Sequence, residues 1–109
     1  MMDLTEAWTT LGKDIKEVFE PLSKLNGLSE KIKYISSQFE IAKRLAKNLM
    51  ALHHPDRNPN DIDAANRFRR IQLALEIIEN ETNQFINKAT QKLENKSIHH
   101  KKDVYIKFL

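Results

Sequence analysis

Apolar residues recur at alternating intervals of four and three along most of the chain, which is the spacing of one buried face on an α-helix. In the central segment this face consists of Leu28, Ile32, Ile35, Phe39, Ala42, Ala46 and Leu49. A second segment has the same spacing at Phe68, Ile71, Leu75, Ile78, Thr82, Phe85, Ala89 and Leu93. Two matched faces joined by a short polar connection predict an antiparallel helical hairpin.

The N-terminal part of the chain shows a related pattern. The apolar residues of this part at helical spacing are Leu4, Trp8, Leu11, Ile15, Val18, Phe19 and Leu22, which predicts one helix over residues 3–20. Pro21 and the polar stretch that follows it, ending at Gly27, indicate a turn. Ser29 is suited to cap the second helix, and Asp61 or Asp63 the third. We therefore expect an all-α fold, an antiparallel helical hairpin with an additional N-terminal helix.

These patterns divide the chain into three parts. Residues 1–27 form the N-terminal helix and turn, residues 28–95 the hairpin, and residues 96–109 a basic C-terminal tail. The tail ends in an apolar run from Val104 to Leu109 that lacks a helical stripe. It could dock back onto the domain, bind a partner, or be the edge of a longer chain, and the sequence does not decide among these.

Composition narrows the class of protein. Charged residues make up 30% of the 109 residues and only two are glycine, which suits a helical protein. There is no cysteine, so disulfides and thiolate metal sites are excluded. No apolar run approaches the roughly 20 residues that span a bilayer, and the acidic N-terminus lacks the layout of a signal peptide. We expect a soluble intracellular protein, in the cytoplasm, with no membrane partner.

The formal net charge is +3, and its distribution is uneven. Residues 28–60 and residues 96–109 are both basic, whereas residues 1–27 and 61–95 carry a small acidic excess. The positive charge therefore lies on the second predicted helix and on the tail. A localised basic face suits an acidic partner surface and increases the rate of encounter more than the affinity.

The connection between the two long helices contains the most distinctive residues. Pro55 has no N–H to donate and ends the helix before it, and Pro59 stiffens the far side of the loop. Between them the loop holds His54 and Asp56, a group that titrates near neutral pH and a fixed negative charge. Because the loop joins two antiparallel helices, we expect it at one end of the molecule, as the functional tip.

The residues on both sides of this loop resemble those of a known family. Residues 43–59 read KRLAKNLMALHHPDRNP, which resembles the second helix and the His-Pro-Asp signature loop of a J domain, the module of DnaJ-type co-chaperones. Residues 68–78, FRRIQLALEII, resemble the third helix of that module. His-Pro-Asp alone is a weak signal, but together with both helices it is a strong one, over roughly residues 40–80.

The resemblance implies a function. His54, Pro55 and Asp56 would engage a DnaK-type (heat shock seventy) chaperone where its nucleotide and substrate domains meet, and would stimulate its ATP hydrolysis. Lys43, Arg44, Lys47 and Arg57 would form a basic docking face. The chain itself would be no enzyme: it would have no catalytic residues, bind no cofactor and hold no metal.

Outside residues 40–80 the chain departs from the family. Trp8-Thr9-Thr10-Leu11-Gly12 has the form of the end of a J-domain first helix, but Gly12 lies 42 positions before His54, more than is usual. The short basic fourth helix, the Gly/Phe-rich linker and the zinc repeats of full DnaJ proteins are not recognisable. Client or targeting contacts would then come from residues 1–27 or 96–109.

Other functions fit the sequence less well. A degenerate J domain would be a helical interaction scaffold that activates no chaperone. A small nucleic-acid-binding protein could use Arg67, Arg69 and Arg70, but acidic residues follow on the same predicted helix. The adjacent pairs His53-His54 and His99-His100 do not have the spacing of zinc ligands.

Overall fold

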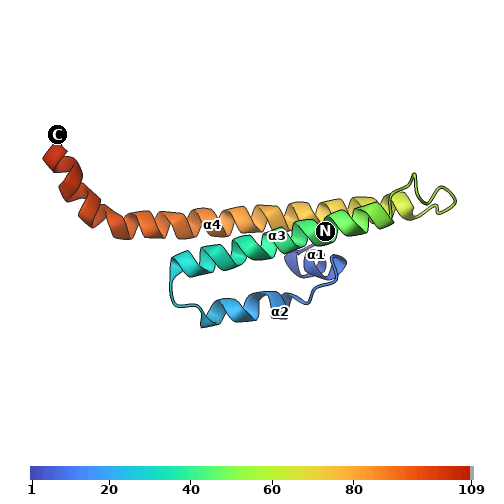
Figure 1. The fold of residues 1–109 in the computed structure, drawn as a ribbon, viewed down its shortest axis with the longest axis horizontal. Coiled ribbons are helices and arrows are strands. Elements are labelled where there is room, and N and C mark those ends of the chain that lie inside the picture. Colours follow the sequence, from blue (N-terminus) through green and yellow to red (C-terminus); the bar gives the residue numbers. More distant parts are fainter. Residues whose placement is uncertain (109) are drawn as a thin grey trace.

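The computed structural model describes the backbone of residues 1–108 and the side chains of residues 1–94. Its elements are α1 (Leu4–Thr10), α2 (Ile15–Phe19), the 3-10 helix η1 (Glu20–Lys24), α3 (Leu28–Leu52) and α4 (Ala64–Phe108). Figure 1 shows α3 and α4 side by side and antiparallel, with α1 and α2 on one side of them. Every element within residues 1–108 is helical, so the predicted all-α hairpin is confirmed.

Small side chains form the centre of the hairpin. Ala42 and Ala46 of α3 and Ala74 of α4 are completely buried, and Ile71 and Ile78 of α4 fill the space beside them. Alanine at the contact lets two helix backbones approach closely, while the branched side chains supply most of the apolar area removed from water. The predicted apolar faces of residues 28–49 and 68–93 therefore face each other in the structure.

The single N-terminal helix predicted over residues 3–20 is wrong, because the chain stops and turns at Gly12. Gly12 has φ +87°, a left-handed conformation that residues with a Cβ rarely adopt. Its N–H donates to the carbonyl of Thr9 at 2.9 Å, and the N–H of Lys13 donates to that of Trp8 at 2.9 Å. These two bonds form the Schellman motif that ends helices. The Asp14 carboxylate then accepts the N–H of Lys16 at 2.9 Å and begins α2.

Residues 1–27 share the core of the hairpin. Ala7, Trp8 and Leu11 are at most 2% exposed and belong to the same buried cluster as Ile71 and Ile78. The hydroxyl of Tyr34 in α3 donates to the carbonyl of Val18, which ties α2 to the hairpin. Burial against these elements raises the pKa of the Tyr34 hydroxyl. The N-terminal segment is thus part of the packed domain.

The two ends of the hairpin differ. Gly27 occupies the N-cap position of α3 and gives it no side-chain cap, so the cap predicted at Ser29 is wrong. At the same end, α4 continues past the start of α3 as far as Phe108 (Figure 1). The side chains of the predicted tail lie outside the described residues, so its three alternatives stay predictions. None of the helices described combines the length and the apolarity that crossing a bilayer requires.

Candidate functional site: the loop between α3 and α4

Residues 53–63 connect α3 to α4 at the end of the hairpin opposite the C-terminus (Figure 1). The last helical hydrogen bond of α3 runs from the N–H of His53 to the carbonyl of Leu49, at 3.0 Å. His53 itself has φ −103° and ψ 13°, outside the helical range. The helix thus ends at Leu52, three residues before Pro55, and the sequence predicts a helix end at this proline.

The imidazole of His54 is held from two sides. Its Nδ1 atom accepts the backbone N–H of Asp56 at 3.1 Å. Its ring meets that of Phe68 from α4 edge to face, with centroids 5.2 Å apart and planes at 81°. The Oδ2 atom of Asp56 lies 3.8 Å from Nδ1, beyond hydrogen-bond distance. The geometry is therefore that of a neutral imidazole that accepts at Nδ1 and carries its proton on Nε2, rather than that of an ion pair.

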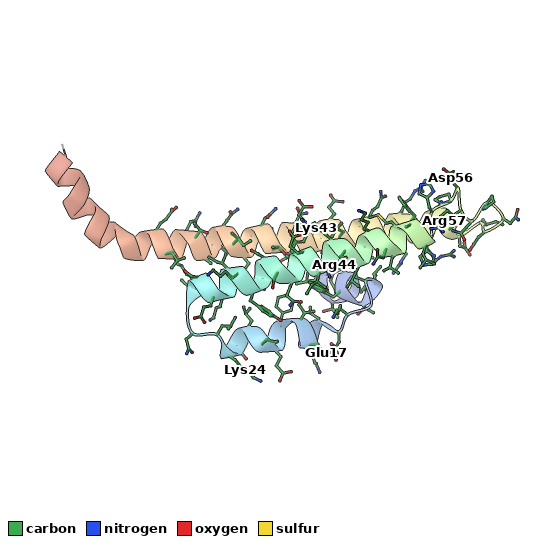
Figure 2. All side chains as sticks on the ribbon, viewed as in Figure 1. Glu17, Lys24, Lys43, Arg44, Asp56 and Arg57 are labelled. Carbon is green, nitrogen blue, oxygen red and sulfur yellow. The ribbon has the colours of Figure 1, made fainter. Side chains whose placement is uncertain are left out.

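The carboxylate of Asp56 is almost fully exposed. Its side chain is 91% accessible, and Figure 2 shows it at the outer end of the hairpin. The carboxylate of Asp56 accepts no hydrogen bond from any other described residue, whereas its backbone is held by His54. At position 56 the loop thus offers an unneutralised negative charge on a fixed main chain.

Arg57 and Asn58 hold the loop against the end of α3. The side-chain amide of Asn58 donates to the carbonyls of Leu52 and His54, at 2.9 and 3.0 Å. The Nη1 atom of Arg57 donates to the carbonyl of Ala51 at 3.3 Å. The last carbonyls of a helix have no partner within the helix, so these side chains satisfy groups that would otherwise need water. The sequence pattern does not predict this contact of Asn58 with α3. Asn58 is notable in the sequence only because it matches the J-domain pattern after His-Pro-Asp.

Arg67 connects the two ends of the loop, a role that the sequence did not predict. Its Nε–H donates to Nδ1 of His53 at 3.1 Å, and its Nη2 donates to Oδ2 of Asp61. The hydrogen bond with Arg67 lowers the pKa of the Asp61 carboxyl and raises the pKa of the Arg67 guanidinium. Arg67 was a candidate phosphate contact in the nucleic-acid alternative, but the structure shows it bound within the domain. Arg69 and Arg70 remain exposed.

The predicted docking residues lie along the exposed side of α3. Lys43, Arg44 and Lys47 are exposed, and their spacing places them within about 100° of one another around the helix. Arg57 extends this row, because it bonds to Ala51, one turn beyond Lys47. We call these four residues the basic strip. Figure 2 shows Lys43 and Arg44 at the middle of α3 and Arg57 at the loop.

Lys43 is partly engaged within its own helix. Its Nζ atom lies 2.7 Å from a carboxylate oxygen of Glu40 and 5.1 Å from the centre of the Phe39 ring. Both partners are on the preceding turn, and the pair with Glu40 is exposed, so it contributes little to stability. The charge of Lys43 is therefore partly offset locally. Arg44 and Lys47 form no ion pair within residues 1–94.

His53 and His54 provide no metal site within the described side chains of residues 1–94. His53 and His54 are engaged with Arg67 and with the loop, and residues 1–94 hold no group of three candidate ligands. The side chains of His99 and His100 lie outside the described residues.

Comparison with known proteins gives one match. Residues 30–86 match the family model described as the DnaJ domain, which covers more than half of the chain. The matched segment contains the basic strip, the whole loop and Arg67, and extends beyond residues 40–80 on both sides. The segment around Trp8 and Gly12 lies outside it. No curated protein and no solved structure matches the chain.

Proposed function

This chain belongs to the J-domain family, and from that membership we propose that it is a co-chaperone of a DnaK-type chaperone whose ATP hydrolysis it stimulates. The observation that carries the proposal is the geometry of the matched loop. An exposed carboxylate, Asp56, stands beside an imidazole fixed by Phe68, at the end of a row of basic side chains.

The loop is suited to docking because little of it must be ordered on binding. Pro55 and Pro59 restrict the main chain, and Asn58 ties it to α3. Conformational freedom already lost in the free protein does not weaken the complex, so contacts made by His54 and Asp56 contribute more of their energy to affinity. The negative charge of Asp56 needs a positive or hydrogen-bond-donating group on the chaperone.

The basic strip would contribute mainly to the rate of encounter. Four exposed cations beside the tip attract an acidic surface over about a Debye length, roughly 8 Å at physiological ionic strength. Lys43 contributes least, because Glu40 offsets it. We therefore expect association with the chaperone to slow as salt is added, and Arg44→Ala or Lys47→Ala to reduce this salt dependence.

Stimulation of ATP hydrolysis would be allosteric, since the hydrolytic site belongs to the chaperone. From the J-domain resemblance we expect the tip to bind where the nucleotide and substrate domains of the chaperone meet. If the tip binds the hydrolysis-competent arrangement more tightly than the resting one, binding shifts the chaperone toward hydrolysis. This chain supplies shape and charge to that interface, and its residues take part in no bond making or breaking.

Client or targeting contacts are proposed for residues 1–27 or 96–109. Because Trp8 and Leu11 belong to the core, deletion of residues 1–27 would unfold the domain and would not test this role. Glu17 and Lys24 lie on the outer side of the N-terminal segment (Figure 2), so the charge reversal of both is the better test. If neither this double variant nor removal of residues 96–109 changed recruitment of the chaperone to its target, the proposed link would be wrong.

Single-turnover ATP hydrolysis by a DnaK-type chaperone from the same source tests the main proposal. The wild-type domain should raise the rate, and His54→Gln, which removes the ring against Phe68, should abolish most of the increase while circular dichroism stays unchanged. A wild-type domain that binds the chaperone without changing the rate would instead indicate the scaffold.

A further inference from the structure

The loop is closed at its base by one arginine that contacts both of its ends. His53 directly precedes the tip and Asp61 follows it by five residues, and each accepts a hydrogen bond from the Arg67 guanidinium, from Nε and Nη2 respectively. Arg67 comes from the first turn of α4, whose backbone is anchored by the N–H of Arg67 donating to the carbonyl of Asp63 at 3.0 Å. The arginine therefore joins the end of α3, the returning loop and the start of α4.

We propose that Arg67 is a positioning residue for the His54-Pro55-Asp56 tip, and that it does this through a neutral His53. This inference rests on the proposed function. Asn58 and Arg57 fix the loop to the last carbonyls of α3, but they bond only to α3 and to the loop itself. Within the described residues, Arg67 and Phe68 are the α4 side chains that form a hydrogen bond or a ring contact with His53, His54 or Asp61, so they set the direction of the tip relative to α4.

The bond to His53 requires a specific protonation state. The Nε–H of Arg67 can donate only if Nδ1 of His53 carries no proton. A proton on Nδ1 would place a donor against a donor and a second cation beside the guanidinium. The groups around His53 are Arg67 and Arg70 of α4, Asp61 of the loop, and Thr10 at the end of α1.

Acid should therefore release one end of the loop. Of the charged groups around His53, the two guanidinium groups repel an imidazolium, and the carboxylate of Asp61 is already bound to Arg67. Once Nδ1 of His53 is protonated, the bond between Arg67 and His53 opens while that to Asp61 remains. Without this bond the His54-Pro55-Asp56 tip is no longer held in one orientation relative to α4, so stimulation of the chaperone should weaken.

The first test compares Arg67→Ala with Arg70→Ala, a matched control three residues further along the same helix. The concentration of domain that gives half-maximal stimulation of the chaperone is measured at pH 7.5. Arg67→Ala should raise it about fivefold, the factor that corresponds to about one net hydrogen bond, with the maximal rate nearly retained. Arg67→Lys should recover part of the loss, and Arg70→Ala should leave the value unchanged. An Arg67→Ala variant that folds and matches Arg70→Ala would overturn the proposal.

The second test uses His53→Asn, whose Oδ1 can take the place of Nδ1 as acceptor and does not titrate. Stimulation, expressed relative to the chaperone alone at each pH, should fall between pH 7.5 and 6.0 for the wild type and fall less for His53→Asn. His54 is present in both proteins, so the difference between the two profiles reports on position 53. Identical pH profiles for the two proteins would contradict the role of His53.

Amide hydrogen exchange separates failure of this inference from failure of the proposed function. The N–H groups of Arg57 and Asn58 donate to the His54 carbonyl and report on the loop without any chaperone. They should exchange faster in Arg67→Ala than in Arg70→Ala. If the wild type stimulates no chaperone but this difference is found, the co-chaperone proposal fails and positioning by Arg67 stands. Equal exchange in both variants refutes the positioning.

Discussion

Neighbouring residues of the loop serve two different purposes. Asp56 directs its charge into solvent, while Asn58, two residues later, turns its amide inward to the carbonyls of Leu52 and His54. His54 combines the two, because its ring is braced by Phe68 and remains 43% exposed. The motif thus contains both groups available to a partner and groups that hold them in place.

Replacing Phe68 by leucine tests whether the aromatic contact orients His54. The change keeps an apolar side chain of similar size but removes an edge-to-face pair that is worth about 0.5–1.5 kcal/mol. We expect the His54 ring protons to shift in the NMR spectrum and stimulation of the chaperone to fall. Phe85→Leu, on the same helix and away from the loop, should do neither. Unchanged His54 resonances in Phe68→Leu would show that the contact does not hold the ring.

Asp61→Asn tests the bond to Arg67 through its pH dependence. The pKa of Asp61 is lower in the folded protein than its ordinary value of about 3.9. A lowered carboxyl pKa stabilises the fold at pH values above the ordinary one, and this contribution is lost as the pH falls through the folded-state pKa. Urea unfolding should therefore show the wild type more stable than Asp61→Asn at pH 7, with the difference shrinking below about pH 4. A difference that is constant down to pH 2 would contradict the ionised pair.

At this scale the sequence predicts a candidate site but not the contacts that support it. His54, Pro55, Asp56 and the basic strip were predicted from the residues themselves and from their J-domain resemblance. The contacts of Arg67 with His53 and Asp61 cross the loop at separations of 14 and 6 residues. Separations of this kind depend on the path of the loop, and no periodic pattern in the sequence encodes them.

At the scale of elements, the apolar pattern predicted the long helices and failed for the short ones. In α3 and α4 the apolar residues repeat over many turns, so the side of each helix that is buried can be predicted from their spacing. Leu11 and Ile15 keep the four-residue spacing across the break at Gly12, so the apolar pattern continues where the helix does not. The glycine and the Asp14 cap were the signals of the break, and the continuous spacing concealed them.

Gly12→Ala tests the importance of this stop. The left-handed φ of Gly12 disfavours any side chain, although the space around it is open. We expect the free energy of unfolding to fall by about 1–2 kcal/mol. Gly27→Ala is the control, since Gly27 has an ordinary φ of −104° and also has open space around it. In Gly27→Ala the lower conformational entropy of the unfolded chain stabilises the fold, and the poorer N-cap destabilises it. The free energy of unfolding should therefore change by no more than about 0.5 kcal/mol. Equal losses in both variants would argue against backbone strain at position 12.

At the scale of the whole molecule, the segment before the family match completes the core. Trp8 is 2% exposed and packs in the same cluster as Ala42, Ala46 and Ile78. The matched residues 30–86 alone would leave this apolar face open to water. From the sequence we predicted residues 1–27 as a separate part of the chain. An apolar stripe on a helix shows that one side is buried, but it does not show which surface of the protein packs against it.

Trp8→Ala should therefore destabilise the domain by about 3–5 kcal/mol, the usual loss for a buried large aromatic side chain. Thermal unfolding measures this loss, and Leu25→Ala, a half-buried residue between η1 and α3, provides a milder comparison. At temperatures where the variant remains folded, stimulation of the chaperone should be unchanged, because the tip lies elsewhere. A stable Trp8→Ala variant would mean that the hairpin folds without the N-terminal segment.

The central claim is that the charge of one exposed loop carboxylate activates a partner ATPase. Single-turnover ATP hydrolysis by a DnaK-type chaperone should be measured with the wild type, Asp56→Asn and Asp63→Asn. Both variants remove one exposed carboxylate charge from the loop with almost no change of shape. Stimulation that is lost in Asp56→Asn and kept in Asp63→Asn is the predicted result. Equal stimulation by all three proteins, or equal loss in both variants, would contradict a specific role for the His54-Pro55-Asp56 tip.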